Sequence, residues 1–265
     1  MKILAQLGDL FLAFCRYLGE LAFLVGEVAE SLWRGRLRWP QFYRQIAEIG
    51  FRSQPVVVIT GAFTGAVLAA QALFQFKLVG METLAGGLVS AAMLRELGPV
   101  ITGLMLAGRV GSSMAAEIGT MRVTEQIDAL RSMAVHPIDY LVTPRFLAMF
   151  VSIPLLLVQS VVCGILASYL IGVPLFHVEE ADWWKNVRQY SSLADVSVAL
   201  IKGGAFGLLI VIISCHQGLQ ASNGAVGVGK GTTRAMVYSS LAILVANFLL
   251  SMLMQLIFPL GIVTS

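Results

Sequence analysis

The sequence has few charged residues for its length. Of its 265 residues, 12% are Asp, Glu, Lys or Arg, against about 25% in typical globular proteins. Hydrophobic residues make up 57% without the 26 glycines, and the mean hydropathy is +0.82. So few charges would not cover a water-facing surface of this size, and the apolar content excludes intrinsic disorder. The composition therefore predicts a polytopic membrane protein.

Cysteine, histidine and net charge are also low. The three cysteines lie far apart in or beside apolar stretches, so we expect no disulfide or redox site. The three histidines lack the spacing of a metal site, and no HExxH motif or G-x-S-x-G elbow is present. A net charge of +3 is too small to indicate a nucleic-acid partner. We therefore expect no metal, no nucleic acid and no catalytic site.

Residues 3–34 are apolar but are interrupted by charges that fall within about a third of a helical wheel. A spanning helix would place each charge in lipid at a cost of about 2.5–3.5 kcal/mol. We therefore expect an amphipathic helix in the membrane interface; a helix packed on the spans, with its charged stripe facing the cytoplasm, is the alternative. The charges are Asp9, Arg16, Glu20, Glu27, Glu30 and Arg34, followed by a basic, aromatic edge of Arg34, Arg36, Arg38 and Trp39.

The rest of the chain predicts an all-α bundle of five membrane spans. Each apolar stretch reaches the roughly 20 residues that cross about 30 Å of hydrocarbon. The expected spans are 55–76, 84–108, 146–176, 196–215 and 236–258. We expect one membrane domain over 1–265, with residues 1–54 as the interfacial helix and cytoplasmic edge and 55–265 as the bundle. Lys202, near the start of the fourth span, is expected to snorkel to the outer interface.

The distribution of Lys and Arg predicts the orientation. These residues are concentrated in 1–54, 109–145 and 216–235, whereas the other side holds only Lys77, Lys185 and Arg188. The positive-inside rule then places the N-terminus in the cytoplasm and the C-terminus in the periplasm. Residues 177–195, which are polar and contain two tryptophans, predict an amphipathic connection at the outer surface. Small residues four apart in three of the spans favour close helix packing.

One loop imitates a nucleotide-binding motif. Residues 224–233 read almost as the P-loop pattern G-x-x-x-x-G-K-[ST], but Gly231 stands where the magnesium-binding hydroxyl belongs. A P-loop also follows a buried strand of an α/β domain, for which there is no room between two spans. We therefore expect a flexible cytoplasmic connection here and no ATPase site.

The second expected span contains two adjacent charges, Arg95 and Glu96, followed by Pro99. Charges inside an apolar span are costly unless paired or hydrated, so they indicate a functional site. Because neighbouring residues point about 100° apart on a helix, each charge needs its own partner. Pro99 frees a backbone carbonyl and bends the helix, which suits a cavity or substrate path. The alternative is a purely structural pairing with neighbouring helices.

Residues 109–145 predict a short amphipathic helix between two spans on the cytoplasmic side. One narrow helical face carries Glu117, Thr120, Thr124, Asp128 and Arg131, and Pro137 and Pro144 bound the segment. This arrangement favours a docking element for a cytosolic partner. The alternative is a solvated loop helix.

Several of these motifs together resemble the MlaE/YrbE family of ABC-transporter permeases, and the resemblance spans nearly the whole chain. The matching segments are Leu94–Pro99, Ala107–Arg109, Ala116–Met121, Thr124–Leu130, Met133–Pro137, Pro144–Phe146, Gly231–Ala235 and Val237–Ala242. Each motif alone is weak, but the combination is specific.

The resemblance implies a partner set and a location. Two copies would form the membrane core of a phospholipid transporter in the bacterial inner membrane, which maintains outer-membrane lipid asymmetry. A separate cytosolic ABC ATPase would bind ATP and Mg²⁺, a STAS-domain protein would bind that ATPase, and a hexameric periplasmic MCE-domain protein would channel lipid. This chain itself would bind no cofactor and catalyse no reaction.

The resemblance also implies two sites. Helix 117–131 would be the coupling helix that docks on the ATPase, with Glu117, Arg122, Thr124, Glu125, Gln126, Asp128 and Arg131 as the docking residues. A lipid cavity would form at the dimer interface near the first, second and fifth spans. Arg95, Glu96 and Leu97 belong there by the family motif, and Leu68, Gln71, Gln75 and Phe76 by their place late in the first span.

Two other functions fit the residues less well. A proton-coupled secondary transporter would use Glu96 as its titrating group. Against this, we find no inverted repeat, and a single intramembrane carboxylate gives a proton relay only one titrating group. A non-transporting membrane scaffold would tolerate apolar residues at Arg95 and Glu96. The transport direction and the lipid head group do not follow from the sequence.

Overall fold

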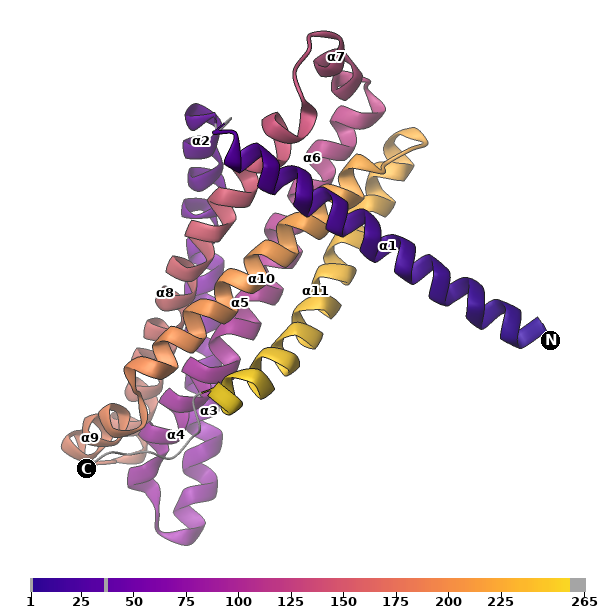
Figure 1. Cartoon of the computed structure of the whole chain (residues 1–265). Coiled ribbons are helices and arrows are strands. Elements are labelled where there is room, and N and C mark those ends of the chain that lie inside the picture. The colour runs from indigo at the N-terminus through magenta and orange to yellow at the C-terminus, as the bar shows by residue number, and fades with distance from the viewer. Residues whose placement is uncertain (1, 36–37, 258–265) are drawn as a thin grey trace.

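The computed structural model describes residues 2–35 and 38–257, and within these ranges the chain folds into helices without any strand (Figure 1). The described part contains five helical segments long and apolar enough to cross a membrane. The all-α, five-span prediction is therefore confirmed.

Most spans are built from more than one element. The first contains α2 (Trp39–Ile49), η1 (Phe51–Ser53) and α3 (Gln54–Val79). The second contains η2 (Glu82–Leu84), α4 (Ala85–Ala92), the π-helical turn η3 (Met93–Leu97), α5 (Gly98–Leu106), the π-helical turn η4 (Ala107–Gly111) and α6 (Ser112–Val123). The third contains the π-helical turn η5 (Ile138–Val142) and α8 (Thr143–Phe176), and the last two are α10 (Leu193–Leu219) and α11 (Gly224–Ile257).

Several expected span boundaries are corrected. The second span continues through residues 109–123, because helical hydrogen bonding carries on past the last strongly apolar residues. Residues 224–233 are the first turns of α11 and not a flexible connection. The first, third and fourth spans also begin earlier than hydropathy suggests, at Trp39, Ile138 and Leu193. Polar helix ends beyond the hydrocarbon account for these differences.

Small residues let α3 and α8 approach closely. A Cβ on Gly65 would lie 2.1 Å from the carbonyl oxygen of Gly164, and one on Gly61 would lie 2.5 Å from that of Ser160. No larger side chain fits at these crossings without moving a backbone. The expected small-residue packing is therefore present between the first and third spans.

The connections lie at the two ends of the bundle as the charge distribution predicts. Helix α2, helix α7 (Gln126–Ser132) and the α10–α11 turn lie at one end, and α9 (Glu180–Tyr190) lies at the other, beside the α3–α4 turn (Figure 1). Helix α9 is the expected amphipathic connection: its Trp183 is fully buried and approaches Gly86 and Gly172. The direction of the bundle across the membrane stays a prediction.

Helix α1 (Lys2–Trp33) crosses the bundle obliquely near its α7 end, and its N-terminal half extends beyond the bundle (Figure 1). Leu24 and Val28 are buried in the core, whereas Phe11, Leu12 and Phe23 are exposed. A helix that packs some apolar side chains on the bundle and exposes others suits a membrane interface. Of the expected basic edge, Arg36 lies outside the described residues.

Candidate functional site

A buried lysine organises the polar centre of the bundle. Lys202 of α10 is 1% exposed, and its Nζ donates to the carbonyl oxygen of Arg95 at 2.7 Å. In a regular α-helix that carbonyl would accept from the N–H of residue 99, which Pro99 lacks. The π-helical turn η3 and Pro99 therefore expose a carbonyl, and Lys202 satisfies it.

The same lysine pairs with Glu96. Its Nζ lies 2.9 Å from Glu96 Oε1 and also donates to Ser251 Oγ of α11 at 2.8 Å. Ser251 Oγ donates to Glu96 Oε1 at 2.8 Å, and Asn247 Nδ2 donates to Glu96 Oε2 at 2.8 Å. Three donors from two helices thus stabilise the charged carboxylate and tie the second, fourth and fifth spans together.

Arg95 has a separate partner at the start of α10. Its Nε lies 2.7 Å from Asp195 Oδ1, and its Nη2 donates to Asp195 Oδ2 at 3.3 Å. Asp195 also accepts from the backbone N–H of Ser192, while the Ser192 side chain accepts from the N–H of Asp195, which together form a capping box. The expectation that Arg95 and Glu96 need separate partners is confirmed.

The snorkelling prediction for Lys202 is wrong, because Glu96 and the Arg95 carbonyl hold its ammonium group inside the bundle. The sequence-based prediction does not identify Asp195 as the partner of Arg95, or Asn247 and Ser251 as partners of Glu96. A signal was present: Asp195 and Lys202 are seven residues apart, which places them on one helical face. That face presents a negative and a positive charge to the Arg95–Glu96 pair on the second span.

The other expected cavity residues divide into two groups. Leu68 and Phe76 of α3 and Leu97 of η3 are partly buried against one apolar cluster around Leu73 and Met93. Gln71 and Gln75 are exposed on the outside of α3. A lipid-lining role for these residues stays a prediction.

The expected single helix over 117–131 is corrected. Helix α6 ends at Val123, Glu125 adopts a left-handed backbone with φ 61°, and α7 begins at Gln126. A non-glycine residue rarely adopts this conformation, so the break is a defined turn between two helices. Glu117 therefore does not share one helical face with Asp128 and Arg131.

The α7 side of this turn is held by a small charge cluster. Asp128 accepts from Arg122 Nη1 at 3.2 Å and from Arg131 Nη1 at 3.1 Å. Ile127 of α7 is buried in the core of the bundle. The remaining expected docking residues, Thr124, Glu125 and Gln126, are exposed. Helix α7 is thus fixed to the bundle by an apolar contact and presents polar side chains outward.

Glu117 lies on α6 and pairs with a buried cation. Its Oε2 is 2.7 Å from Nη2 of Arg145, which is 4% exposed and also donates from Nη1 to the carbonyl oxygen of Leu141 at 2.6 Å. This ion pair connects the end of the second span to the start of the third. In the described part of the chain, no group of three or more acidic, His or Cys side chains is placed to hold a metal ion.

Comparison with known proteins gives consistent results. The family model "Permease MlaE" matches residues 42–253. A probable ABC transporter permease protein of Rickettsia conorii is 41% identical over 94% of this chain and 96% of its own length. The intermembrane phospholipid transport system permease protein MlaE of Haemophilus influenzae is 32% identical over 96% of this chain and 98% of its own length.

A plant protein is also related. The chloroplastic protein TRIGALACTOSYLDIACYLGLYCEROL 1 of Arabidopsis thaliana is 36% identical over 86% of this chain and 65% of its own length. The matched region of the family model contains both the Lys202 cluster and the α6–α7 turn. This chain therefore belongs to the MlaE permease family.

Proposed function

We propose that this chain is the permease subunit of an ABC transporter that moves phospholipid between the bacterial inner membrane and a periplasmic MCE-domain protein. Membership of the MlaE permease family carries the proposal. The relative from Haemophilus influenzae, which bears the name of an intermembrane phospholipid transport permease, supports the lipid substrate. In this role the chain acts as a homodimer, binds no nucleotide and maintains outer-membrane lipid asymmetry with its partners.

The charge cluster suggests how the permease moves between two states. Glu96 contacts α10 and α11, and Arg95 contacts α10, so motion of the second span strains these pairs together. Paired charges break and re-form between discrete arrangements instead of deforming continuously. We assign Arg95 and Glu96 to the wall of the lipid path and the α6–α7 turn to the contact with the cytosolic ATPase, to which the STAS-domain protein binds.

Two observations weigh against the rival functions. Glu96 already accepts from Lys202, Ser251 and Asn247, and a proton-coupled carrier would have to break these contacts at every cycle. A passive scaffold gives no reason to bury a lysine at a proline-freed carbonyl inside the bundle.

Copurification tests whether a cytosolic ATPase binds this chain. The tagged chain, expressed from its native locus and isolated in mild detergent, should bring ATP hydrolysis with it. Asp128→Arg places a third cation beside Arg122 and Arg131 and should remove that activity, since it rearranges the docking turn. Glu179→Arg, the same charge reversal at the exposed opposite end, is the control and should retain it. A stable preparation without ATPase activity would overturn the proposal.

Outer-membrane lipid asymmetry tests the assignment of Arg95 and Glu96 to the lipid path. Arg95→Ala and Glu96→Ala should each expose phospholipid on the outer leaflet of the outer membrane while the complex still assembles. Normal asymmetry in both variants would exclude the path assignment and favour a scaffold.

A further inference from the structure

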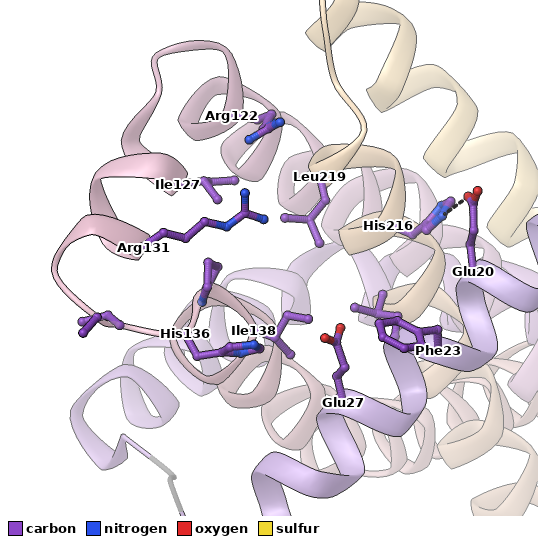
Figure 2. A pocket seen from close by; sticks show the side chains of 14 residues that line it. Glu20, Phe23, Glu27, Arg122, Ile127, Arg131, His136, Ile138, His216 and Leu219 are labelled. Atoms are coloured by element: carbon purple, nitrogen blue, oxygen red, sulfur yellow. Dashed lines mark hydrogen bonds and ion pairs between the residues drawn. The ribbon is translucent and has the colours of Figure 1, made fainter.

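A cavity of about 720 Å³ lies between α1, the α7 region and the end of α10 (Figure 2). Its walls combine apolar side chains with charges of both signs. The apolar part includes Phe23, Leu24, Ile127, Ile138 and Leu219, and the charged part includes Glu20, Glu27, Arg122 and Arg131. This composition differs from a purely apolar groove between spans.

Opposite charges face each other across this space. Arg131 from α7 and Glu27 from α1 point toward the cavity from opposite sides (Figure 2). Within residues 2–35 and 38–257, Glu27 forms no hydrogen bond or ion pair. The contacts of Arg131 and Arg122 with Asp128 use Nη1 of each guanidinium, which leaves further N–H donors for an anion. The cavity thus holds separated groups that suit an anion and a cation.

Nearby charges restrict what binds there. Glu20 is occupied: it accepts from Gln220 at 2.7 Å and lies 3.1 Å from His216 Nε2. A ligand with only negative charge would meet Glu27 as well as the arginines, and a ligand with only positive charge would meet both arginines. A ligand that carries both a negative and a positive charge satisfies both walls.

We propose that this cavity binds the head group of a zwitterionic phospholipid. Its phosphate contacts Arg131 and Arg122, its ammonium contacts Glu27, and its glycerol region lies on Phe23 and Ile138. The inference rests on the proposed function for the lipid substrate and for the position of the α7 end at the cytoplasmic surface.

The position of the cavity between α1 and α7 favours a lipid over a partner peptide. One wall is α1, which exposes Phe11, Leu12 and Phe23 and suits the membrane interface. The opposite wall is α7, at the end of the bundle beyond α1 (Figure 1). A space between an interfacial helix and a more peripheral one lies where phospholipid head groups lie. The site is separate from the Lys202 cluster and would hold lipid of the cytoplasmic leaflet.

Photolabelling tests the site with the full chain alone. The chain is placed in nanodiscs of phosphatidylethanolamine and phosphatidylglycerol with a trace of phosphatidylethanolamine that carries a diazirine near its head group. Mass spectrometry should find the label on α1 near Phe23 and on residues 127–138. Arg131→Gln and Glu27→Gln should each reduce this labelling about tenfold, the loss expected for one charge-assisted contact.

A charge reversal gives the sharper result. Glu27→Lys leaves three cations around the cavity, so phosphatidylglycerol should now compete better than unlabelled phosphatidylethanolamine. Glu30→Gln is the control, because Glu30 pairs with Arg34 on α1 and does not line the cavity. An unchanged melting midpoint shows that each variant is folded.

Other outcomes overturn the proposal. Labelling that is equal in wild type, Arg131→Gln and Glu27→Gln excludes a head-group site. Cross-links from this cavity to the ATPase subunit in the complete transporter, with no lipid label, assign it to a protein segment instead. Because the photolabelling needs no ATPase, its failure leaves the copurification result, and with it the proposed function, unaffected.

Discussion

The strongest energetic prediction concerns Lys202. Lys202→Met keeps an unbranched side chain of similar length but removes the ammonium group from a site that is 1% exposed. Glu96 then loses its counter-charge, and the Arg95 carbonyl loses its donor, since Pro99 provides no N–H. Breaking a buried pair from one side costs about 3–5 kcal/mol. The Glu96 side chain is 45% exposed, so we expect the lower end, about 3 kcal/mol.

The double variant separates a stranded charge from lost packing. The double variant Lys202→Met with Glu96→Gln has no unpaired carboxylate. The Arg95 carbonyl is then the main group without a donor, which lowers the free energy of unfolding by about 1 kcal/mol. The double variant should therefore be more stable than Lys202→Met by about 2 kcal/mol. For a chain of 265 residues, 1 kcal/mol shifts the melting midpoint by about 2–4 °C.

Tryptophan fluorescence in nanodiscs measures these midpoints. Lys202→Met should melt about 6–12 °C below wild type, and the double variant about 2–4 °C below, on the same scale. Lys185→Met on the exposed face of α9 is the matched control and should melt with wild type. A double variant that melts as low as Lys202→Met, or lower, would refute the pairing.

Two further predictions follow from the helix contacts. Gly65→Ala should lower the melting midpoint by the equivalent of about 1–3 kcal/mol, because its Cβ would meet the α8 backbone at 2.1 Å, whereas Gly229→Ala, with nothing within 4 Å, should not lower it. Hydrogen bonds from Gln220 and His216 hold the pKa of the Glu20 carboxyl below its ordinary 4.5. The attachment of α1 to α10 should therefore be strongest above pH 4.5 and should weaken as pH falls through the lowered pKa of Glu20. The distance between spin labels on the two helices measures this attachment. A Glu20→Gln variant that keeps the same pH response would contradict the prediction.

Hydropathy and charge predict much of this fold because the membrane imposes simple rules. Span number, the grouping of the connections at two ends and the amphipathic character of residues 180–190 follow from apolar length and from the positions of Lys and Arg. Helix ends are less predictable, since polar residues such as those at 224–233 continue a helix beyond the hydrocarbon without any change in hydropathy.

The site is harder to predict, because its contacts join residues 100 to 155 positions apart. The sequence identifies Arg95 and Glu96 as charges that need partners, but helix rotation decides which partners they find. The sequence is compatible with two positions for the Lys202 ammonium group, one at the outer interface and one against a buried acceptor. The carbonyl freed by Pro99 selects the buried one.

The helix break within residues 117–131 shows where the local sequence pattern fails to predict a helix end. Residues 117–131 have a helical pattern throughout, and no glycine or proline marks a turn between Val123 and Gln126. Glu125 nevertheless adopts a left-handed backbone, while Ile127 is buried in the bundle. Tertiary packing of α7 therefore overrides the local preference for one continuous helix.

The central claim is that this permease uses ATP hydrolysis in a partner to move phospholipid. The most direct measurement is the transfer of a fluorescent phospholipid from proteoliposomes that contain the purified transporter, with and without ATP. We expect transfer that requires ATP, is lost in Asp128→Arg and persists in Glu179→Arg. Transfer that proceeds equally without ATP, or that survives in Asp128→Arg, would contradict the claim.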